Sequence, residues 1–218
     1  MSTLADTFTL LNALFGMLAV ASVGDPAALA FLICAVMCDG IDGFVSRRDG
    51  GEERTGVVMD SLSDSISFVL FPALFLFVSR ETWGIETFLF SLTAFIYVWA
   101  GLYRLARFTV HDGLGKTFRG LPVPAAALLL SFSLSFGLRF SPPVISLLLS
   151  FLMVSSVQYP KMRGRTAIVG GIFLLFALIS LCAEFSTLGY LFFSGLLLYL
   201  VSPLFIKSFI SHKKHSEK

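Results

Sequence analysis

Apolar residues follow one another in eight long segments separated by short polar breaks. The segments run over Phe8–Val23, Ala27–Ser46, Gly56–Ser79, Ile85–Phe108, Val123–Leu138, Pro143–Val157, Ala167–Ala183 and Phe185–Ile206. Glycine and proline mark most of the breaks and favour turns there. Since a membrane-spanning helix needs about 20 largely apolar residues, the pattern predicts an all-α protein. We expect a polytopic membrane helical bundle of about eight transmembrane helices, although the first, fifth and sixth segments are short.

Composition narrows the class of protein further. The chain has 218 residues, of which 56% are hydrophobic and 14% are charged, whereas an average soluble domain carries about 25% charged residues. A soluble enzyme, a disordered protein and a nucleic-acid-binding module are therefore disfavoured. The net charge of +2 gives no strong field for nucleic acid. We expect one integral-membrane domain over residues 1–218, with the lipid bilayer as its surroundings and no nucleic-acid partner.

Basic residues lie almost entirely on one side of the predicted bundle. Eight spans place both termini on the same side, and fourteen of the sixteen Lys and Arg residues face that side. The other side carries only Arg80 and Arg139. Cytoplasmic loops carry an excess of Lys and Arg, so both termini and the basic side are predicted to be cytoplasmic.

Two pairs of carboxylates lie close to that cytoplasmic side. Asp39 and Asp42 end the second segment, and Asp60 and Asp64 begin the third. Spacings of three and four residues place each pair on one face of its helix, and a short loop makes the two helices antiparallel neighbours. Four carboxylates in one small volume need cations to stay ionised. Oxygen ligands select Mg²⁺, Mn²⁺ or Ca²⁺, and two such ions commonly serve phosphoryl transfer.

Other interpretations of these carboxylates stay open at this point. An ionisable residue inside a membrane span can belong to a proton relay or an ion pathway. Each pair can also form a structural salt bridge with Arg47 or Arg54. Four carboxylates on two adjacent helices, with glycines between them, favour the metal site.

The residues around both pairs also follow a known pattern. Residues 39–47 read D-G-I-D-G-F-V-S-R, and eight residues later 56–64 read G-V-V-M-D-S-L-S-D. They resemble the D-x-x-D-G-x-x-A-R … G-x-x-x-D-x-x-x-D signature of the CDP-alcohol phosphotransferases, with Ser46 in place of the usual alanine. Residues 103–108 (Y-R-L-A-R-F) and 118–126 (F-R-G-L-P-V-P-A-A) resemble segments of integral-membrane phosphatidylserine synthases. Archaeal relatives of that branch make archaetidylserine.

The resemblance implies transfer of a lipid-phosphoryl group from CDP-diacylglycerol or CDP-archaeol to an alcohol, with release of CMP. In the serine branch the acceptor is the hydroxyl of L-serine. Asp39, Asp42 and Asp60 would hold one metal ion, Mg²⁺ or Mn²⁺, and Asp39, Asp60 and Asp64 a second. Asp64 would be the general base, and the enzyme would be a homodimer. The resemblance implies that the CDP-lipid is bound by the signature residues Asp39, Asp42, Gly43, Ser46, Arg47, Gly56 and Asp60.

Polar and basic residues near these aspartates are further candidates for binding. Arginine forks match carboxylates bidentately, so Arg104 and Arg107 are the first candidates for the carboxylate of serine, with Arg119 and Lys116 next. Basic residues at a cytoplasmic helix end can instead anchor lipid headgroups. Asn12, in the first segment, can bind nucleotide or acceptor or join two helices.

Two rival functions stay open. Within the family, the acceptor can be glycerol 3-phosphate or inositol phosphate. Outside it, the four carboxylates can serve a cation- or proton-coupled transporter, although such carboxylates lie more naturally near the bilayer midplane. Their position beside a cytoplasmic, glycine-bearing loop favours chemistry on a cytosolic nucleotide. We therefore expect a multi-pass enzyme of the cell membrane with its active site facing the cytoplasm.

Overall fold

The fold is a bundle of apolar helices, seen in a computed structural model that describes residues 3–48, 54–79, 84–112, 117–136, 142–160, 165–182 and 191–203. The α-helices are α1 (Thr3–Ala21), α2 (Ala27–Arg48), α3 (Arg54–Asp64), α4 (Phe71–Val78), α5 (Ile85–Arg107), α6 (Val123–Ser135), α7 (Pro142–Val154) and α8 (Arg165–Cys182). Two π-helical segments, η1 (Ser65–Leu70) and η2 (Phe108–Asp112), continue α3 and α5. The strands are β1 (Thr117–Arg119) and β2 (Gln158–Pro160). A last helix covers Leu191–Pro203.

Each of the eight apolar segments expected from the sequence contains a helix, and the helical membrane bundle is confirmed. Four stretches are long and apolar enough to cross a membrane: Leu4–Ala21, Ala27–Ser46, Thr55–Val78 and Ile85–Val110. The four later helices are shorter than a span in the part of the chain that is described. Eight full spans, and the cytoplasmic position of both termini, stay predictions.

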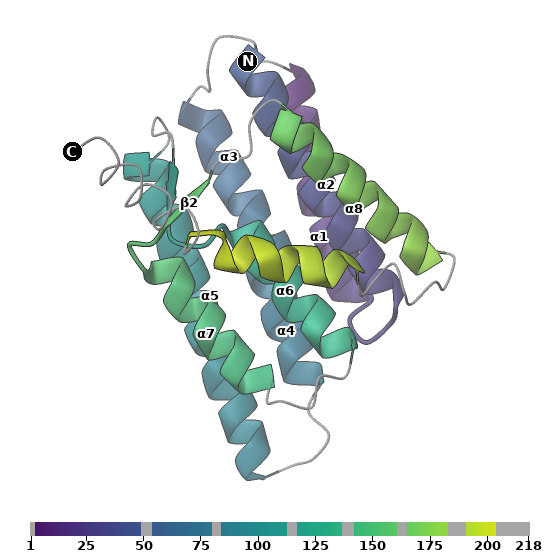
Figure 1. The fold of residues 1–218 in the computed structure, drawn as a ribbon, viewed down its shortest axis with the longest axis vertical. Coiled ribbons are helices and arrows are strands. Elements are labelled where there is room, and N and C mark those ends of the chain that lie inside the picture. Colours follow the sequence, from purple (N-terminus) through teal and green to yellow (C-terminus); the bar gives the residue numbers. More distant parts are fainter. Residues whose placement is uncertain are drawn as a thin grey trace, which may run out of the picture.

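The helices pack in two flanks around a buried centre (Figure 1). Helices α1, α2 and α8 lie on one flank, and α5 packs along α7 on the other. Between them lies α6, whose residues from Ala126 to Ser133 are all buried. A helix that is apolar on every side is stable only when neighbours cover it, so α6 forms the centre of the bundle.

The last helix differs from the membrane span that the sequence predicts over Phe185–Ile206. In Figure 1 the helix Leu191–Pro203, drawn in yellow, runs crosswise to its neighbours. Aromatic contacts hold it there: the ring centroid of Phe192 lies 5.0 Å from that of Phe132 in α6, and Tyr199 lies 5.8 Å from Tyr159 in β2. The Tyr159 hydroxyl also donates to the carbonyl of Leu200 at 3.4 Å. These rings fix the helix against α6 and the strands.

Two short strands form a ribbon: β1 lies in the segment between η2 and α6, and β2 lies in the segment that follows α7. Strands β1 and β2 are antiparallel, with Phe118 opposite Tyr159. Gly120 follows β1 with a φ of 79°, and its N–H donates to the carbonyl of Val157 at 2.7 Å. A Cβ at Gly120 would lie 2.2 Å from the carbonyl oxygen of Met153. Only glycine fits this backbone conformation and this close approach.

Replacement of Gly120 by alanine should therefore destabilise the protein strongly. Gly24 is the matched control, because its φ of 94° is also left-handed while no described atom lies within 4 Å of the position of its Cβ. We expect Gly24→Ala to cost about 1–2 kcal/mol from backbone conformation alone, and Gly120→Ala to cost clearly more. Melting temperatures in detergent measure the difference. Equal losses would contradict the close contact between Gly120 and Met153.

Candidate active site

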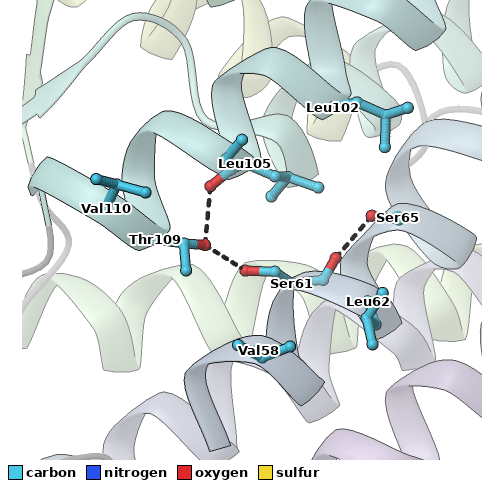
Figure 2. A pocket seen from close by; sticks show the side chains of 9 residues that line it. Val58, Ser61, Leu62, Ser65, Leu102, Leu105, Thr109 and Val110 are labelled. Carbon is cyan, nitrogen blue, oxygen red and sulfur yellow. Dashed lines mark hydrogen bonds between the residues drawn. The ribbon is translucent and has the colours of Figure 1, made fainter. Parts of the chain in front are cut away.

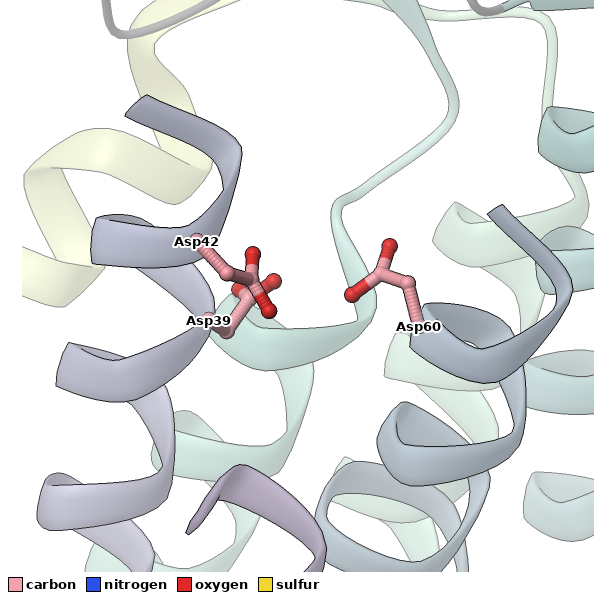
Figure 3. Close-up of side chains that lie close together, drawn as sticks. All are labelled: Asp39, Asp42 and Asp60. Atoms are coloured by element: carbon pink, nitrogen blue, oxygen red, sulfur yellow. The ribbon is translucent and has the colours of Figure 1, made fainter. Parts of the chain in front are cut away.

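Three carboxylates from two helices meet at one end of the bundle. Asp39 and Asp42 extend from α2 toward Asp60 on α3 (Figure 3). One oxygen from each residue lies within 4.8 Å of the others. The spacing of three residues in α2 places Asp39 and Asp42 on one face, and the antiparallel approach of α3 brings Asp60 to that face.

The donor set and its geometry fit a hard divalent cation. Carboxylate oxygens are the ligands that Mg²⁺, Mn²⁺ and Ca²⁺ prefer. Ligand distances of about 2.0–2.6 Å place oxygens on opposite sides of one ion roughly 4–5 Å apart, and the three aspartates fall within that limit. Asp42 is 6% exposed, and Asp39 and Asp60 are half-buried. Ionised carboxylates so close together and so little hydrated need nearby positive charge.

Asp64 lies one helical turn from Asp60 but is not part of that group of three. It is 6% exposed. The side-chain amide of Asn12, in α1, donates to its Oδ1 at 3.0 Å. The charges of Asp39 and Asp60 also act on Asp64. The fourth carboxylate thus lies beside the other three while α1 fixes its orientation.

Helix α1 supplies a second contact, which the sequence analysis missed. The hydroxyl of Thr9 donates to Oδ2 of Asp42 at 2.9 Å. Thr9 and Asn12 are three residues apart in an otherwise apolar segment, so they share a helix face. That polar face in an apolar span was the signal that could have identified Thr9.

Asn12 carries an unusual buried oxygen. Its side chain is fully buried, its amide N–H is bonded to Asp64, and its Oδ1 has no hydrogen-bond partner among the described residues. Leaving a buried acceptor unsatisfied costs about 1–3 kcal/mol. Such exceptions call for an explanation in structure or function, and Asn12 lies directly beside the aspartates because it donates to Asp64.

Arg104, on α5, is buried within electrostatic range of the aspartates. It is 5% exposed, and its guanidinium lies 5.3 Å from the ring centroid of Phe108. The negative charges of Asp64 and Asp39 attract it, and the positive charge of Arg107 repels it. A buried arginine in this position offers both positive charge and a fork for an anionic group.

The other basic candidates are placed differently. The guanidinium of Arg107 donates to the carbonyl of Val154 at 3.2 Å and to the carbonyl of Arg119. Arg107 therefore ties the end of α7 to β1, a supporting contact that the sequence analysis did not predict. Arg119 has an exposed side chain. Lys116 and the side chain of Arg47 lie outside the described residues.

Open space lies beside two glycines of the signature segment. A Cβ at Gly40 or Gly56 would meet no described atom within 4 Å. Glycine inside a helix is about 1 kcal/mol less favourable than alanine, and packing within the described chain does not require it here. Gly43 and Ser46 are half-buried near the end of α2. A side chain at Gly40 or Gly56 would therefore meet no steric obstacle from the described packing.

A mainly apolar groove of about 320 Å³ lies between the α3–η1 and α5–η2 segments (Figure 2). Its walls include Val58, Leu62 and Leu102. The hydroxyls of Ser61 and Thr109 are 2.7 Å apart across it. Because Ser61 follows Asp60 directly, the groove occupies a face of α3 next to the one that carries the aspartates.

Comparison with known proteins places the chain in a family. A family model described as CDP-alcohol phosphatidyltransferase matches residues 2–158. The archaetidylserine synthase of Methanothermobacter thermautotrophicus is 36% identical over 171 residues, which cover 75% of this chain and 72% of that protein. The CDP-diacylglycerol–serine O-phosphatidyltransferase of Methanocaldococcus jannaschii is 32% identical, over 83% of this chain and 82% of that protein. The enzyme of the same name from Bacillus subtilis is 28% identical, over 73% and 90%.

The matched region contains all four aspartates together with Asn12 and Arg104. It ends before α8 and the crosswise last helix. The resemblance that the signature segments indicate is confirmed over most of the chain, and this chain belongs to the CDP-alcohol phosphatidyltransferase family of enzymes.

Proposed function

We propose that this enzyme transfers the phosphatidyl or archaetidyl group of a CDP-linked lipid to the hydroxyl of L-serine and releases CMP. The observation that carries the proposal is the group of three carboxylates within 4.8 Å of one another, in a chain of this family. Serine as acceptor is supported by the names of the relatives and by a buried arginine beside the aspartates.

The aspartates would hold two divalent ions, Mg²⁺ or Mn²⁺. Asp39, Asp42 and Asp60 would ligate the first, and Asp39, Asp60 and Asp64 the second. Bound there, such ions polarise phosphoryl oxygens and stabilise the CMP leaving group. Thr9 supports this arrangement because its hydrogen bond holds Asp42 in place.

We assign Asp64 as the general base that accepts the proton of the serine hydroxyl. Asn12 holds its Oδ1, so Oδ2 is the oxygen that would accept the proton. The serine oxygen forms a bond to the phosphorus next to the lipid, and the phosphoanhydride bond to CMP breaks. A hydroxyl is a weak nucleophile, and removal of its proton by a positioned base assists the attack.

Arg104 would bind the carboxylate of serine, since its planar fork matches a carboxylate. On the donor side, Gly43, Ser46, Arg47 and Gly56 would lie against the CDP group. The space beside Gly56 supports this assignment. Arg119 and Lys116 would lie further out, where they can attract anionic substrates or headgroups.

The lipid chains of the donor would stay in the bilayer, since moving them into water is costly. Serine and CMP would exchange with the cytoplasm, which the basic residues of the predicted loops mark as the side of the active site. We further propose that residues 1–218 act as one integral-membrane domain and that the enzyme is a homodimer.

An acceptor panel tests the proposed reaction. Purified protein in detergent receives CDP-diacylglycerol or CDP-archaeol with Mn²⁺ or Mg²⁺, and in turn L-serine, glycerol 3-phosphate, inositol phosphate or buffer. Among these acceptors, we expect only L-serine to support CMP release. We expect the release to stop when a chelator removes the metal. Release with a different alcohol would overturn the serine assignment, and no release from folded protein with any of these acceptors would contradict the proposed reaction.

Replacing Arg104 and Arg107 by lysine, one at a time, distinguishes a residue that binds serine from one that stabilises the fold. Arg104→Lys loses the bidentate fork, so we expect the KM for serine to rise about tenfold or more, in line with about 1.5–3 kcal/mol for a hydrogen bond to a charged group. Arg107→Lys should lower the melting temperature and leave that KM nearly unchanged, because Arg107 binds backbone carbonyls. Equal effects of both variants on KM would contradict the separate roles.

A further inference from the structure

The helix that carries Asp60 and Asp64 changes its winding directly after Asp64. The apolar stretch Thr55–Val78 is divided into α3, the π-helical η1 and α4. At the end of η1 the N–H of Phe71 donates to the carbonyl of Ile66, five residues back. This spacing defines a π-helix, and short π-helical segments are frequent at functional sites.

Pro72 removes one α-helical hydrogen bond directly after η1. In an α-helix residue 72 would donate its N–H to the carbonyl of Phe68, but proline has no N–H. Phe68 is completely buried, and an unsatisfied carbonyl in an apolar bundle is costly. The hydroxyl of Tyr97, from α5, donates to that carbonyl at 3.2 Å. Tyr97 is itself completely buried.

The winding of η1 sets the direction in which the aspartates point. One residue of an α-helix corresponds to a rotation of about 100°, and a π-helical turn takes in one residue more than an α-helical turn. On one side of η1, α4 is fixed by the completely buried Phe71 and Leu76. On the other side, α3 presents Asp60 toward α2. A regular α-helix through η1 would turn α3 by about 100° relative to α4.

Helix α1 holds η1 at a second point. The hydroxyl of Ser67 donates to the backbone carbonyl of Asn12 at 2.9 Å. Helix α1 packs so closely against η1 that a Cβ added at Gly16 would lie 2.2 Å from Oγ of Ser67. Asn12 in turn holds Asp64. The π-helical turn is thus held by α5 at Phe68 and by α1 at Ser67.

We propose that Tyr97 is a positioning residue for the aspartate site. Its hydroxyl takes the place of the N–H that Pro72 lacks, and it thereby stabilises the π-helical turn that directs Asp60 and Asp64 toward Asp39 and Asp42. The inference rests on the proposed function in one respect only, namely that the aspartates bind divalent metal ions. The rotation of α3 is a property of the fold and can be measured without substrate.

The test compares Tyr97→Phe with Tyr103→Phe. Tyr103 lies on the same helix with its side chain 46% exposed and its ring stacked on Trp99, so Tyr103→Phe is the control that removes a tyrosine hydroxyl from α5. The native cysteines are first replaced, and spin labels are attached at Ile41→Cys in α2 and Leu62→Cys in α3. Double electron–electron resonance then measures the distance between the two labels, which changes when α3 rotates. With a helix radius of about 5–6 Å including side chains, a 100° turn moves a side chain by roughly 8 Å.

We expect Tyr97→Phe to shift or broaden this distance distribution and to weaken Mn²⁺ affinity by about tenfold or more, the usual range for residues that orient metal ligands. Both values should stay near those of the wild type in Tyr103→Phe. Affinity is measured without substrate, at a temperature where circular dichroism shows full helix content. An unchanged distance distribution in folded Tyr97→Phe would overturn the proposal.

A double variant tests whether Tyr97 positions the aspartates or only provides a hydrogen-bond partner for the buried Phe68 carbonyl. In Tyr97→Phe with Pro72→Ala, the N–H at position 72 can bond to the Phe68 carbonyl. That carbonyl then keeps a partner without the hydroxyl of Tyr97, and the segment can wind as a regular α-helix. We expect the distance to stay shifted and Mn²⁺ affinity to stay low. Recovery of both values would overturn the proposal. If wild-type protein binds no Mn²⁺ while Tyr97→Phe still shifts the distance, the metal assignment fails and the positioning role stands.

Discussion

Repulsion between carboxylates gathered from two apolar helices is the constraint on which the rest of the structure depends. Asp39, Asp42 and Asp60 each place an oxygen within 4.8 Å of the others. Two unit charges 4 Å apart interact by roughly 4 kcal/mol at an effective dielectric constant of 20. Such a group is stable only when positive charge or hydrogen-bond donors offset the repulsion, and the bundle brings both to this place.

The surrounding helices supply these compensating contacts. Helix α1 contributes the hydroxyl of Thr9 to Asp42 and the amide of Asn12 to Asp64. Helix α5 contributes Arg104, on which the charges of Asp64 and Asp39 act. Orientation of the ligands by neighbouring groups is what tunes a metal site. Helices α1 and α5 thus surround the carboxylates of α2 and α3 with hydrogen-bond donors and positive charge.

The parts of the site that depend on local spacing were predictable from the sequence. Intervals of three and four residues predict one pair on each helix, and a short loop predicts that the two pairs face each other. The structure brings Asp39, Asp42 and Asp60 together, while Asp64 lies outside that group of three. The eight apolar segments likewise located the helices. The contacts that depend on long-range packing were not predictable: the π-helical η1, the β1–β2 ribbon and the crosswise last helix require partners far away in the chain. Arg107 shows the same limit, because its sequence pattern resembles that of Arg104 while its guanidinium binds backbone carbonyls.

The most direct test of the central claim is the binding of Mn²⁺ to purified protein, followed by electron paramagnetic resonance without substrate. Asp60 would contact both ions, so Asp60→Asn removes a shared ligand, while Asp25→Asn alters an exposed aspartate in the α1–α2 loop. The account predicts Mn²⁺ binding to the wild type and to Asp25→Asn, and its loss in folded Asp60→Asn. Undiminished binding in Asp60→Asn would contradict it.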